Sequence, residues 1–427
     1  MIKMKIVHPG MNANVTHIDP DLLRRFKPLD QLPLRTLKYI AGESSIESLK
    51  ADSTIHARGA SDHQVSYLLS GDVELIKESG KTDRVSAGSE RGRNPLSILQ
   101  PFDDSAKTRG PVTLLKLSRE LYESICRLPS TQNQAEDRTQ PAGLDARERT
   151  LYENFCAAVL EGKLDVPSMP DIAMRIAKTV NNPETDSEDI ARVIQADPTV
   201  AARLISVVNS AAYRGASTIN SLPGAVSRLG RNVIHNLVIS FALGSLFRSR
   251  SQVLQEKMQD LWKHSCYVAA ICHVLGKVTP GKSADHALLC GLVHDIGALP
   301  IIGAARSHPE ITDNPKILDR AIQQLAPEVG AMVLKRWAFG DDFIQTALRS
   351  EDWMQDSGDK PSYLDLVIVA QLHAYIGTER MRQLPRIDLV PAFHKLALGR
   401  LTPRHSIGVL EDANEQIREL QSLLSGN

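Results

Sequence analysis

The most restrictive feature of this 427-residue sequence is a sharp change of pattern between Leu128 and Arg147. The segment between them, LPSTQNQAEDRTQPAGLDAR, is rich in Pro, Gln, Thr and charge and poor in apolar residues, which is typical of a linker. Before it, short runs alternate apolar and polar residues, as strands do. After it, apolar residues recur every three or four positions, as in amphipathic helices. The chain is therefore expected to hold a β-rich domain followed by an all-α domain.

The alternating runs of the N-terminal part are separated by turn residues. The stretch HQVSYLLSGDVELIKESGK predicts a strand, a tight turn around Gly71 and a second strand. Further short runs begin at Arg84 and Val112, and SRELYESICRL predicts a closing helix. Short strands, glycine turns and a terminal helix together predict a small β-barrel with flanking helices over residues 29–128.

Within that region, VSYLLSGDVELI resembles the hairpin of the cyclic-nucleotide-binding domain family. In that family a Gly-Glu dipeptide that opens a short helix holds the ribose, and a following arginine neutralises the cyclic phosphate. Here GSERGRNPLSILQPFDDSAKTRGP has no Gly-Glu before an apolar helix, and Pro95 and Pro101 interrupt it. Arg109 is the candidate remnant of the phosphate arginine. The resemblance therefore implies a degenerate sensor or dimerisation module, with nucleotide binding through Arg109 as the alternative.

The helical part carries several motifs of one family. Asp186 and Asp197 are placed to cap the helices that follow them, and Pro198 falls in a first turn, where its missing N–H costs nothing. The pattern ADPxxxxRxxxxxNSAxY contains the last two of these residues, and GLVHDIG follows at residues 291–297 and ExGxxxLxxW at residues 328–337. Together they resemble the HDOD domain, an HD-related output domain of bacterial signalling proteins. The resemblance implies an all-α, HD-like helical bundle.

Most residues of these motifs are expected to serve the fold. The motif positions are Asp197, Pro198, Arg203, Asn209, Ser210, Gly230, Glu328, Gly330 and Trp337. Asn209 and Ser210 are expected to tie a helix end to the next loop through side-chain to backbone hydrogen bonds, with ligand contact as the alternative. Gly230 is expected in the middle of a helix, where it allows close packing. Trp337 is expected to be a large apolar anchor.

The resemblance also raises the question of a metal. In HD phosphohydrolases two imidazoles and two carboxylates hold a divalent ion, which lowers the pKa of bound water and neutralises phosphate charge. By this resemblance, His264 in LWKHSCYVAAICHVLGKV and the pair His294 and Asp295 match three of the ligands. The helix DLVIVAQLHAYIG should supply the last carboxylate. His373 stands at that position, and Asp365 lies about two helical turns earlier.

Other positions depart from the hydrolytic pattern. Ala298 stands where hydrolytic HD domains often have a lysine, and Ser350 and Glu351 replace the His pair of HD-GYP enzymes. The sequence therefore favours a protein with no metal, cofactor or catalytic residue. In this interpretation the vestigial candidates would be buried, hydrogen-bonded packing residues. These candidates are His264, His294, Asp295 and His373. Metal binding without turnover, or hydrolysis of a nucleotide with His373 as a replacement ligand, are the alternatives.

Composition narrows the class of partner. Lys+Arg and Asp+Glu both number 50, so no net charge attracts the chain to nucleic acid. We find no membrane-spanning apolar run and no signal peptide, so a cytoplasmic location is expected. The five scattered cysteines form no CxxC pair and are expected to be reduced core thiols.

These observations predict the following division of the chain. Residues 1–28 form an N-terminal extension, 29–128 the barrel, 129–146 a linker, 147–380 the HDOD helical domain and 381–427 a C-terminal helical extension. Apolar residues from Ile407 to Leu424 predict a last amphipathic helix that docks on the bundle or on a second subunit, so a homodimer is possible.

The sequence favours a non-enzymatic bacterial regulator whose HDOD domain binds other signalling proteins. A metal-dependent HD-type phosphohydrolase and a nucleotide-gated regulator are the alternatives.

Overall fold

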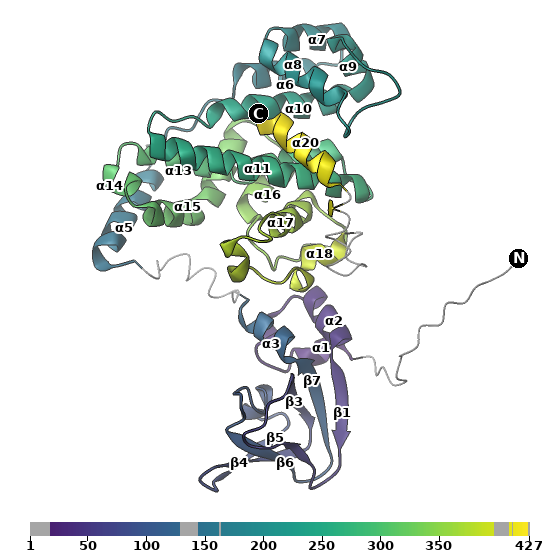
Figure 1. Ribbon diagram of the computed structural model, residues 1–427, viewed down its shortest axis with the longest axis vertical. Coiled ribbons are helices and arrows are strands. Elements are labelled where there is room, and N and C mark those ends of the chain that lie inside the picture. Colours follow the sequence, from purple (N-terminus) through teal and green to yellow (C-terminus); the bar gives the residue numbers. More distant parts are fainter. Residues whose placement is uncertain (1–17, 129–143, 162–163, 397–409, 412, 426–427) are drawn as a thin grey trace, which may run out of the picture. The chain divides into compact units, whose positions relative to one another are not determined.

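The computed structural model describes residues 18–128, 144–161, 164–396, 410–411 and 413–425 (Figure 1). The predicted linker and N-terminal extension lie largely outside these residues, as does Ile407. The chain forms two compact units. The first comprises residues up to 131 together with Asp388–Pro391, and the second comprises residues 132–387 and 392–427.

Among its described residues, the first unit contains three helices and two antiparallel sheets. Its elements are α1 (Pro20–Leu23), α2 (Leu34–Glu43), β1 (Ser45–Leu49), β2 (Thr54–His56), β3 (Gln64–Ser70), β4 (Asp72–Lys77), β5 (Thr82–Ser86), β6 (Asp104–Thr108), β7 (Val112–Ser118) and α3 (Arg119–Cys126), with short 3-10 turns η1 (Leu29–Gln31) and η2 (Arg91–Arg93). One sheet has the strand order β1-β7-β3 and the other β2-β6-β4-β5. Apolar side chains from both sheets, including Leu68, Val73 and Leu114, form the core.

The predicted barrel and its hairpin at Gly71 need correction. The two sheets are not closed into a barrel. Strand β3 pairs with β7, whereas β4 pairs with β5 and β6, so the chain passes from one sheet to the other at Gly71. Gly71 has φ 91°, and a Cβ there would lie 2.6 Å from the carbonyl oxygen of Pro111. The alternating pattern predicts strands but not their partners, and this glycine corner sends neighbouring strands into different sheets.

The second unit is all helical among the described residues. Its elements are α5 (Ala146–Leu160), α6 (Asp171–Asn181), α7 (Ser187–Gln195), α8 (Pro198–Val208), α9 (Leu222–Leu229), α10 (Arg231–Leu243), η3 (Gly244–Leu246), α11 (Gln252–Val278), α12 (Ala284–Val293), α13 (Ala298–Ala305), α14 (Pro309–Thr312), α15 (Pro315–Arg336), α16 (Asp341–Arg349), α17 (Tyr363–Ala374), η4 (Glu379–Gln383), α18 (Pro391–Lys395) and α20 (Asn414–Ser425). The 3-10 turn η5 (Ile387–Leu389) and the first residue of α18 fall at the boundary of the two units. Helix α11 runs through this unit and packs against α12, α17 and α20 (Figure 1).

The predicted helix starts are confirmed. The side chains of Asp186 and Asp197 accept hydrogen bonds from backbone N–H groups in the first turns of α7 and α8, and Pro198 occupies the first turn of α8. Gly230 is different from the expectation. It separates α9 from α10 with φ 81°, and a Cβ there would meet nothing within 4 Å, so its role is the left-handed backbone and not close packing.

The loop after α8 is tied as expected by one residue of the predicted pair. Asn209 donates to the carbonyl oxygens of Ile205 and Ile219 and accepts from the N–H of Ile219. The hydroxyl of Ser210 is buried and has no hydrogen-bond partner among the described residues, so it does not share this role. Arg203 is half-buried on α8.

The C-terminal helix α20 docks on its own unit. It packs against α11 and α8 through the buried side chains of Ile417, Leu420 and Leu424. The carboxylate of Glu419 accepts a 2.8 Å hydrogen bond from the N–H of Ala211. The helix was expected to dock on the bundle or on a second subunit, and in the structure it docks on the bundle.

The stretch Ala284–Ala305 differs from the expectation that the sequence has no apolar run of membrane-spanning length. Its 22 residues are long and apolar enough to cross a membrane, although 83% of the relevant window is buried inside the unit. The core helix of a soluble protein has the same property. The cysteines also differ in part from the expectation, because Cys266, Cys272 and Cys290 are buried whereas Cys126 is exposed.

Candidate functional site

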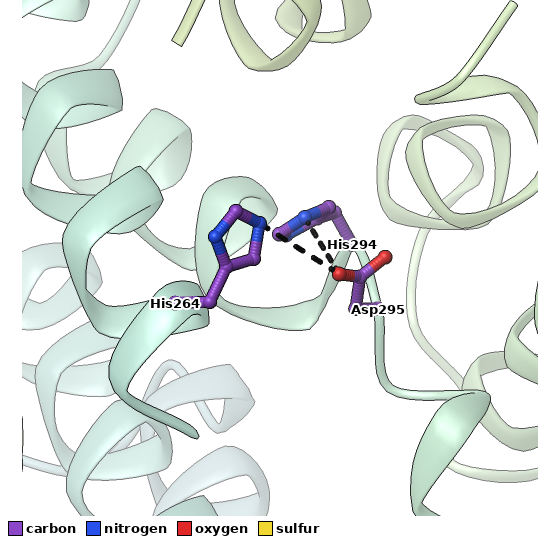
Figure 2. Close-up of side chains that lie close together, drawn as sticks. All are labelled: His264, His294 and Asp295. Atoms are coloured by element: carbon purple, nitrogen blue, oxygen red, sulfur yellow. Dashed lines mark ion pairs between the residues drawn. The ribbon is translucent and has the colours of Figure 1, made fainter. Parts of the chain in front are cut away.

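Two packed helices and one turn position the candidate site. His264 lies in the middle of α11, and His294 ends α12 as its C-terminal cap. Asp295 follows in the turn before α13. Figure 2 shows the imidazole of His264 facing the side chains of His294 and Asp295.

Close backbone packing holds this turn in place. A Cβ on Gly297 would lie 2.0 Å from the carbonyl oxygen of Ala326 and 2.5 Å from the nitrogen of Gly330. A Cβ on Gly330 would in turn meet Ala347 at 3.2 Å. These two glycines therefore let α15 approach the turn that carries Asp295. The ExGxxxLxxW motif contributes its glycine to this contact.

Two other residues of that motif, Trp337 and Glu328, have different surroundings. The indole of Trp337 is largely buried and donates a 3.0 Å hydrogen bond to the carbonyl oxygen of Pro167, which agrees with the expected anchor. Glu328 is exposed on α15, so the expected packing role does not apply to it.

The three site residues converge closely. The Nε2 atom of His294 lies 3.1 Å from Oδ2 of Asp295, and Nε2 of His264 lies 3.9 Å from the same oxygen. One ligand atom from each of the three residues lies within 4.8 Å of the others. The side chain of His294 is fully buried, whereas that of Asp295 keeps 26% of its surface exposed. The side chain of His264 keeps 20% of its surface exposed, so the carboxylate and this imidazole are the accessible members of the cluster.

The two ring nitrogens of His294 have different surroundings. Its Nδ1 lies 2.7 Å from the carbonyl oxygen of Gly291, a distance at which the Nδ1–H donates. Its Nε2 has ion-pair distance to Asp295 but no hydrogen bond of good geometry among the described residues. That nitrogen is therefore directed at Asp295 and is left for either a proton or a cation.

The charges of the cluster follow from burial and proximity. Burial opposes the charged form of His294, but the Asp295 carboxylate outweighs it and raises the pKa of His294. Burial likewise opposes ionisation of Asp295, but His294 lowers the pKa of this carboxyl. Burial, assisted by the charge of His294, lowers the pKa of His264 to about 4. The shifts of His294 and Asp295 thus favour the ionised form of both residues, and the imidazole of His264 is neutral at neutral pH.

Three further residues border the cluster. Tyr375 follows α17, and its Oη lies 3.3 Å from Nε2 of His264, with the two rings stacked at a centroid distance of 5.0 Å. The Cζ atom of Arg380, in η4, lies 4.6 Å from the centre of the Tyr375 ring. Arg380 forms an ion pair with Glu351, which follows α16. The charge of Arg380 also contributes to lowering the pKa of Asp295.

Sequence reasoning missed most of this border. It noted Glu351 only as a replacement for a histidine, and it assigned no role to Tyr375 or Arg380. Both follow α17, and no periodicity or motif marks them. The sequence AYIGTER after the expected ligand position was the one available signal, because the chain must leave the helix beside the site.

The expected replacement ligand lies outside the cluster. His373 is buried on α17, but it is not among the described residues whose ligand atoms converge with His264, His294 and Asp295. Burial lowers the pKa of His373 to about 4. The earlier carboxylate of the same helix, Asp365, accepts hydrogen bonds from the N–H and the hydroxyl of Ser362 at the start of α17 and forms a buried ion pair with Lys395.

The donor set fits one divalent ion. Two imidazole nitrogens and one carboxylate oxygen are the number of protein ligands found in many catalytic zinc sites. His294 supports the fit, because its Nδ1–H is held by Gly291 and its Nε2 is left to coordinate. An ion bound there would lower the pKa of a coordinated water. Tyr375 would first have to release Nε2 of His264.

The candidate nucleotide residue of the first unit is already paired. The Nε atom of Arg109 lies 2.7 Å from Oε1 of Glu74 on β4. Along β4, Val73 and Leu75 are buried in the core and Glu74 alternates with them, so this ion pair lies on the other face of the strand. The arginine therefore does not face the apolar core between the sheets.

Comparison with known proteins agrees with this fold. Residues 166–353 match the model of the HDOD domain family. An uncharacterised protein of Treponema pallidum (strain Nichols) is 24% identical over 238 residues, which cover 53% of this chain and 45% of the relative. The chain thus spans less than half the length of this curated relative.

Two solved structures match different parts of the chain. A protein of Shewanella amazonensis SB2B, whose name proposes a metal-dependent phosphohydrolase, aligns with 66% of this chain and all of its own at 26% identity and a TM-score of 0.58. A protein of Geobacter metallireducens GS-15, whose name proposes cyclic-nucleotide binding, aligns with 34% of this chain and 97% of its own at 26% identity and a TM-score of 0.23.

The helices, the His-Asp turn and the family match all concern the same part of the chain. The HDOD domain is related to the HD phosphohydrolases. Residues 166–353 match the HDOD domain family, and this is the family that the helical part of the chain resembles.

Proposed function

We propose that this protein is a regulator of bacterial signal transduction whose HDOD domain binds other signalling proteins and does not hydrolyse a phosphoester. The observation that carries the proposal is the contact between Tyr375 and His264. Burial raises the pKa of Tyr375, so the phenol stays neutral, and it donates to Nε2 of the neutral imidazole when the proton of that ring is on Nδ1. A nitrogen that would bind a metal is therefore already satisfied by a neighbouring side chain.

The charges around the cluster support the same proposal. The carboxylates of Asp295 and Glu351 are matched by the imidazolium of His294 and the guanidinium of Arg380. Only the side chain of His294 is fully buried among these four, and each charge has an oppositely charged partner among the described residues. The cluster can therefore serve as a fixed polar contact among α11, α12 and the segment after α17.

Positions that assist hydrolysis in related enzymes also lack suitable groups. Ala298, at the position of the lysine, is buried and apolar. Ser350 is buried, and Glu351 is held by Arg380. This chain thus offers no lysine at that position and no pair of imidazoles at Ser350 and Glu351, which supports a role in binding.

The proposal includes no cofactor and no nucleic acid. The partners of the protein are other signalling proteins and a second copy of this chain, and its location is the cytoplasm.

The test is hydrolysis of phosphodiesters and nucleotides by the full-length protein with Mg²⁺, Mn²⁺, Fe²⁺ or Zn²⁺. We expect rates equal to those of buffer and metal alone, and equal rates for the Asp295→Ala variant. Metal-dependent turnover that disappears in Asp295→Ala would contradict the proposal, because Asp295 supplies the carboxylate of the cluster.

A metal-dependent phosphohydrolase acting on a nucleotide is the second candidate, and one observation favours it. The Nε2 atom of His294 is buried, has no hydrogen bond of good geometry and is directed at Asp295. A divalent ion between these groups would satisfy that nitrogen as well as a proton does. The hydrolysis assay separates the two candidates.

A further inference from the structure

We propose that Arg380 controls the affinity of the His264, His294 and Asp295 cluster for a divalent cation, and that Glu351 is a latent fourth ligand which Arg380 withholds. The inference deepens the proposed function and rests on it, because it gives a physical reason why the cluster would stay free of metal.

Arg380 borders the cluster through the ring of Tyr375. The Cζ atom of its guanidinium lies 4.6 Å from the centre of the Tyr375 ring, and the imidazole of His264 stacks on the same ring. Arg380 is thus held next to the cluster through a stack of three planar groups. Its charge acts on both His264 and Asp295, and a positive charge near the cluster opposes the arrival of a divalent cation.

Glu351 is the ion-pair partner of Arg380. This residue follows α16, and the guanidinium of Arg380 forms an ion pair with its carboxylate. Its charge acts on His294 as well as on Tyr375, so the carboxylate lies near the cluster although it is not one of the converging ligands. Its side chain is 25% exposed, which leaves room for a change of rotamer.

The ligand atoms of His264, His294 and Asp295 do not complete the coordination of a divalent ion. Two imidazoles and one carboxylate leave a fourth position open, and a second carboxylate there would neutralise a divalent ion. Arginine is the residue that most firmly holds a carboxylate, because its planar donors match the two oxygens. Removing Arg380 therefore removes a repulsive charge and frees a ligand at the same time.

The test is Mn²⁺ binding measured by calorimetry or by competition with a fluorescent chelator. The proteins are the wild type, Arg380→Gln and the double variant Arg380→Gln/Glu351→Gln. Arg382→Gln is the matched control, because Arg382 lies in the same 3-10 turn but is exposed and paired with Glu379. Arg380→Met keeps the aliphatic stem against Tyr375 and serves as the second variant if the glutamine form does not fold. Circular dichroism reports folding in each case.

We expect Arg380→Gln to bind Mn²⁺ at least about tenfold more tightly than the wild type, the scale of effects from residues that contact metal ligands. The added Glu351→Gln change should remove the gain, and Arg382→Gln should match the wild type. Equal affinities of Arg380→Gln and the wild type, or a gain that persists without Glu351, would overturn the inference. These comparisons do not depend on the hydrolysis assay, so the inference and the proposed function can fail separately.

Discussion

Replacing Lys395 by methionine is expected to lower the free energy of unfolding of the helical unit by about 3–5 kcal/mol, the range for breaking a buried ion pair. The Nζ atom of Lys395 lies 3.0 Å from Oδ1 of Asp365, and both side chains have no exposed surface. The methionine would leave the Asp365 carboxylate buried without its cation. Urea unfolding followed by helical circular dichroism measures the change.

Two further variants make this test specific. Lys335→Met removes an exposed lysine from α15 and should change the free energy of unfolding by less than about 0.5 kcal/mol. Lys395→Met/Asp365→Asn removes both charges and should recover part of the loss, because no unpaired charge remains. A Lys395→Met protein as stable as the wild type would show that this ion pair does not hold α18 to α17.

Replacing Gly297 by alanine is expected to destabilise the helical unit by about 3 kcal/mol or more, because the added methyl group has no space. Its Cβ would lie 2.0 Å from the backbone oxygen of Ala326, and backbone cannot move aside as a flexible side chain can. Since Gly297 is two residues after Asp295, the change should also displace the candidate site. Thermal or urea unfolding measures the effect.

A glycine in the next helix provides the matched control. Gly303 is exposed in α13, and a Cβ there would meet nothing within 4 Å. Gly303→Ala should therefore raise the free energy of unfolding by up to about 1 kcal/mol, since alanine favours the helix. If Gly297→Ala and Gly303→Ala had the same stability, the close contact between α15 and the His-Asp turn would be wrong.

Local features of the fold were predictable because they depend on neighbouring residues. Asp186 and Asp197 cap the helices that begin directly after them, and such caps need only a few residues of sequence. The barrel was wrong in its closure, because strand pairing is set by distant contacts such as the one between Gly71 and Pro111. Gly230 was placed within a helix because a repeated apolar pattern continues across a change of helix direction.

The candidate site was predictable only in part. The resemblance to the HDOD domain identified His264, His294 and Asp295, and the structure brings them together. The side chains that border them, Tyr375 and Arg380, come from the segment after α17 and belong to no motif. Their importance depends on where the chain goes after a helix ends, which is a property of the tertiary structure.

The metal content of the purified protein shows whether the cluster of His264, His294 and Asp295 holds an ion, as a phosphohydrolase would require. The measurement is elemental mass spectrometry of freshly purified full-length protein, with His294→Ala as the control. We predict far less than one ion of Fe, Mn, Zn or Mg per chain in the wild type and the same amount in the variant. Close to one ion per wild-type chain, lost in His294→Ala, would contradict the proposed function and favour the phosphohydrolase.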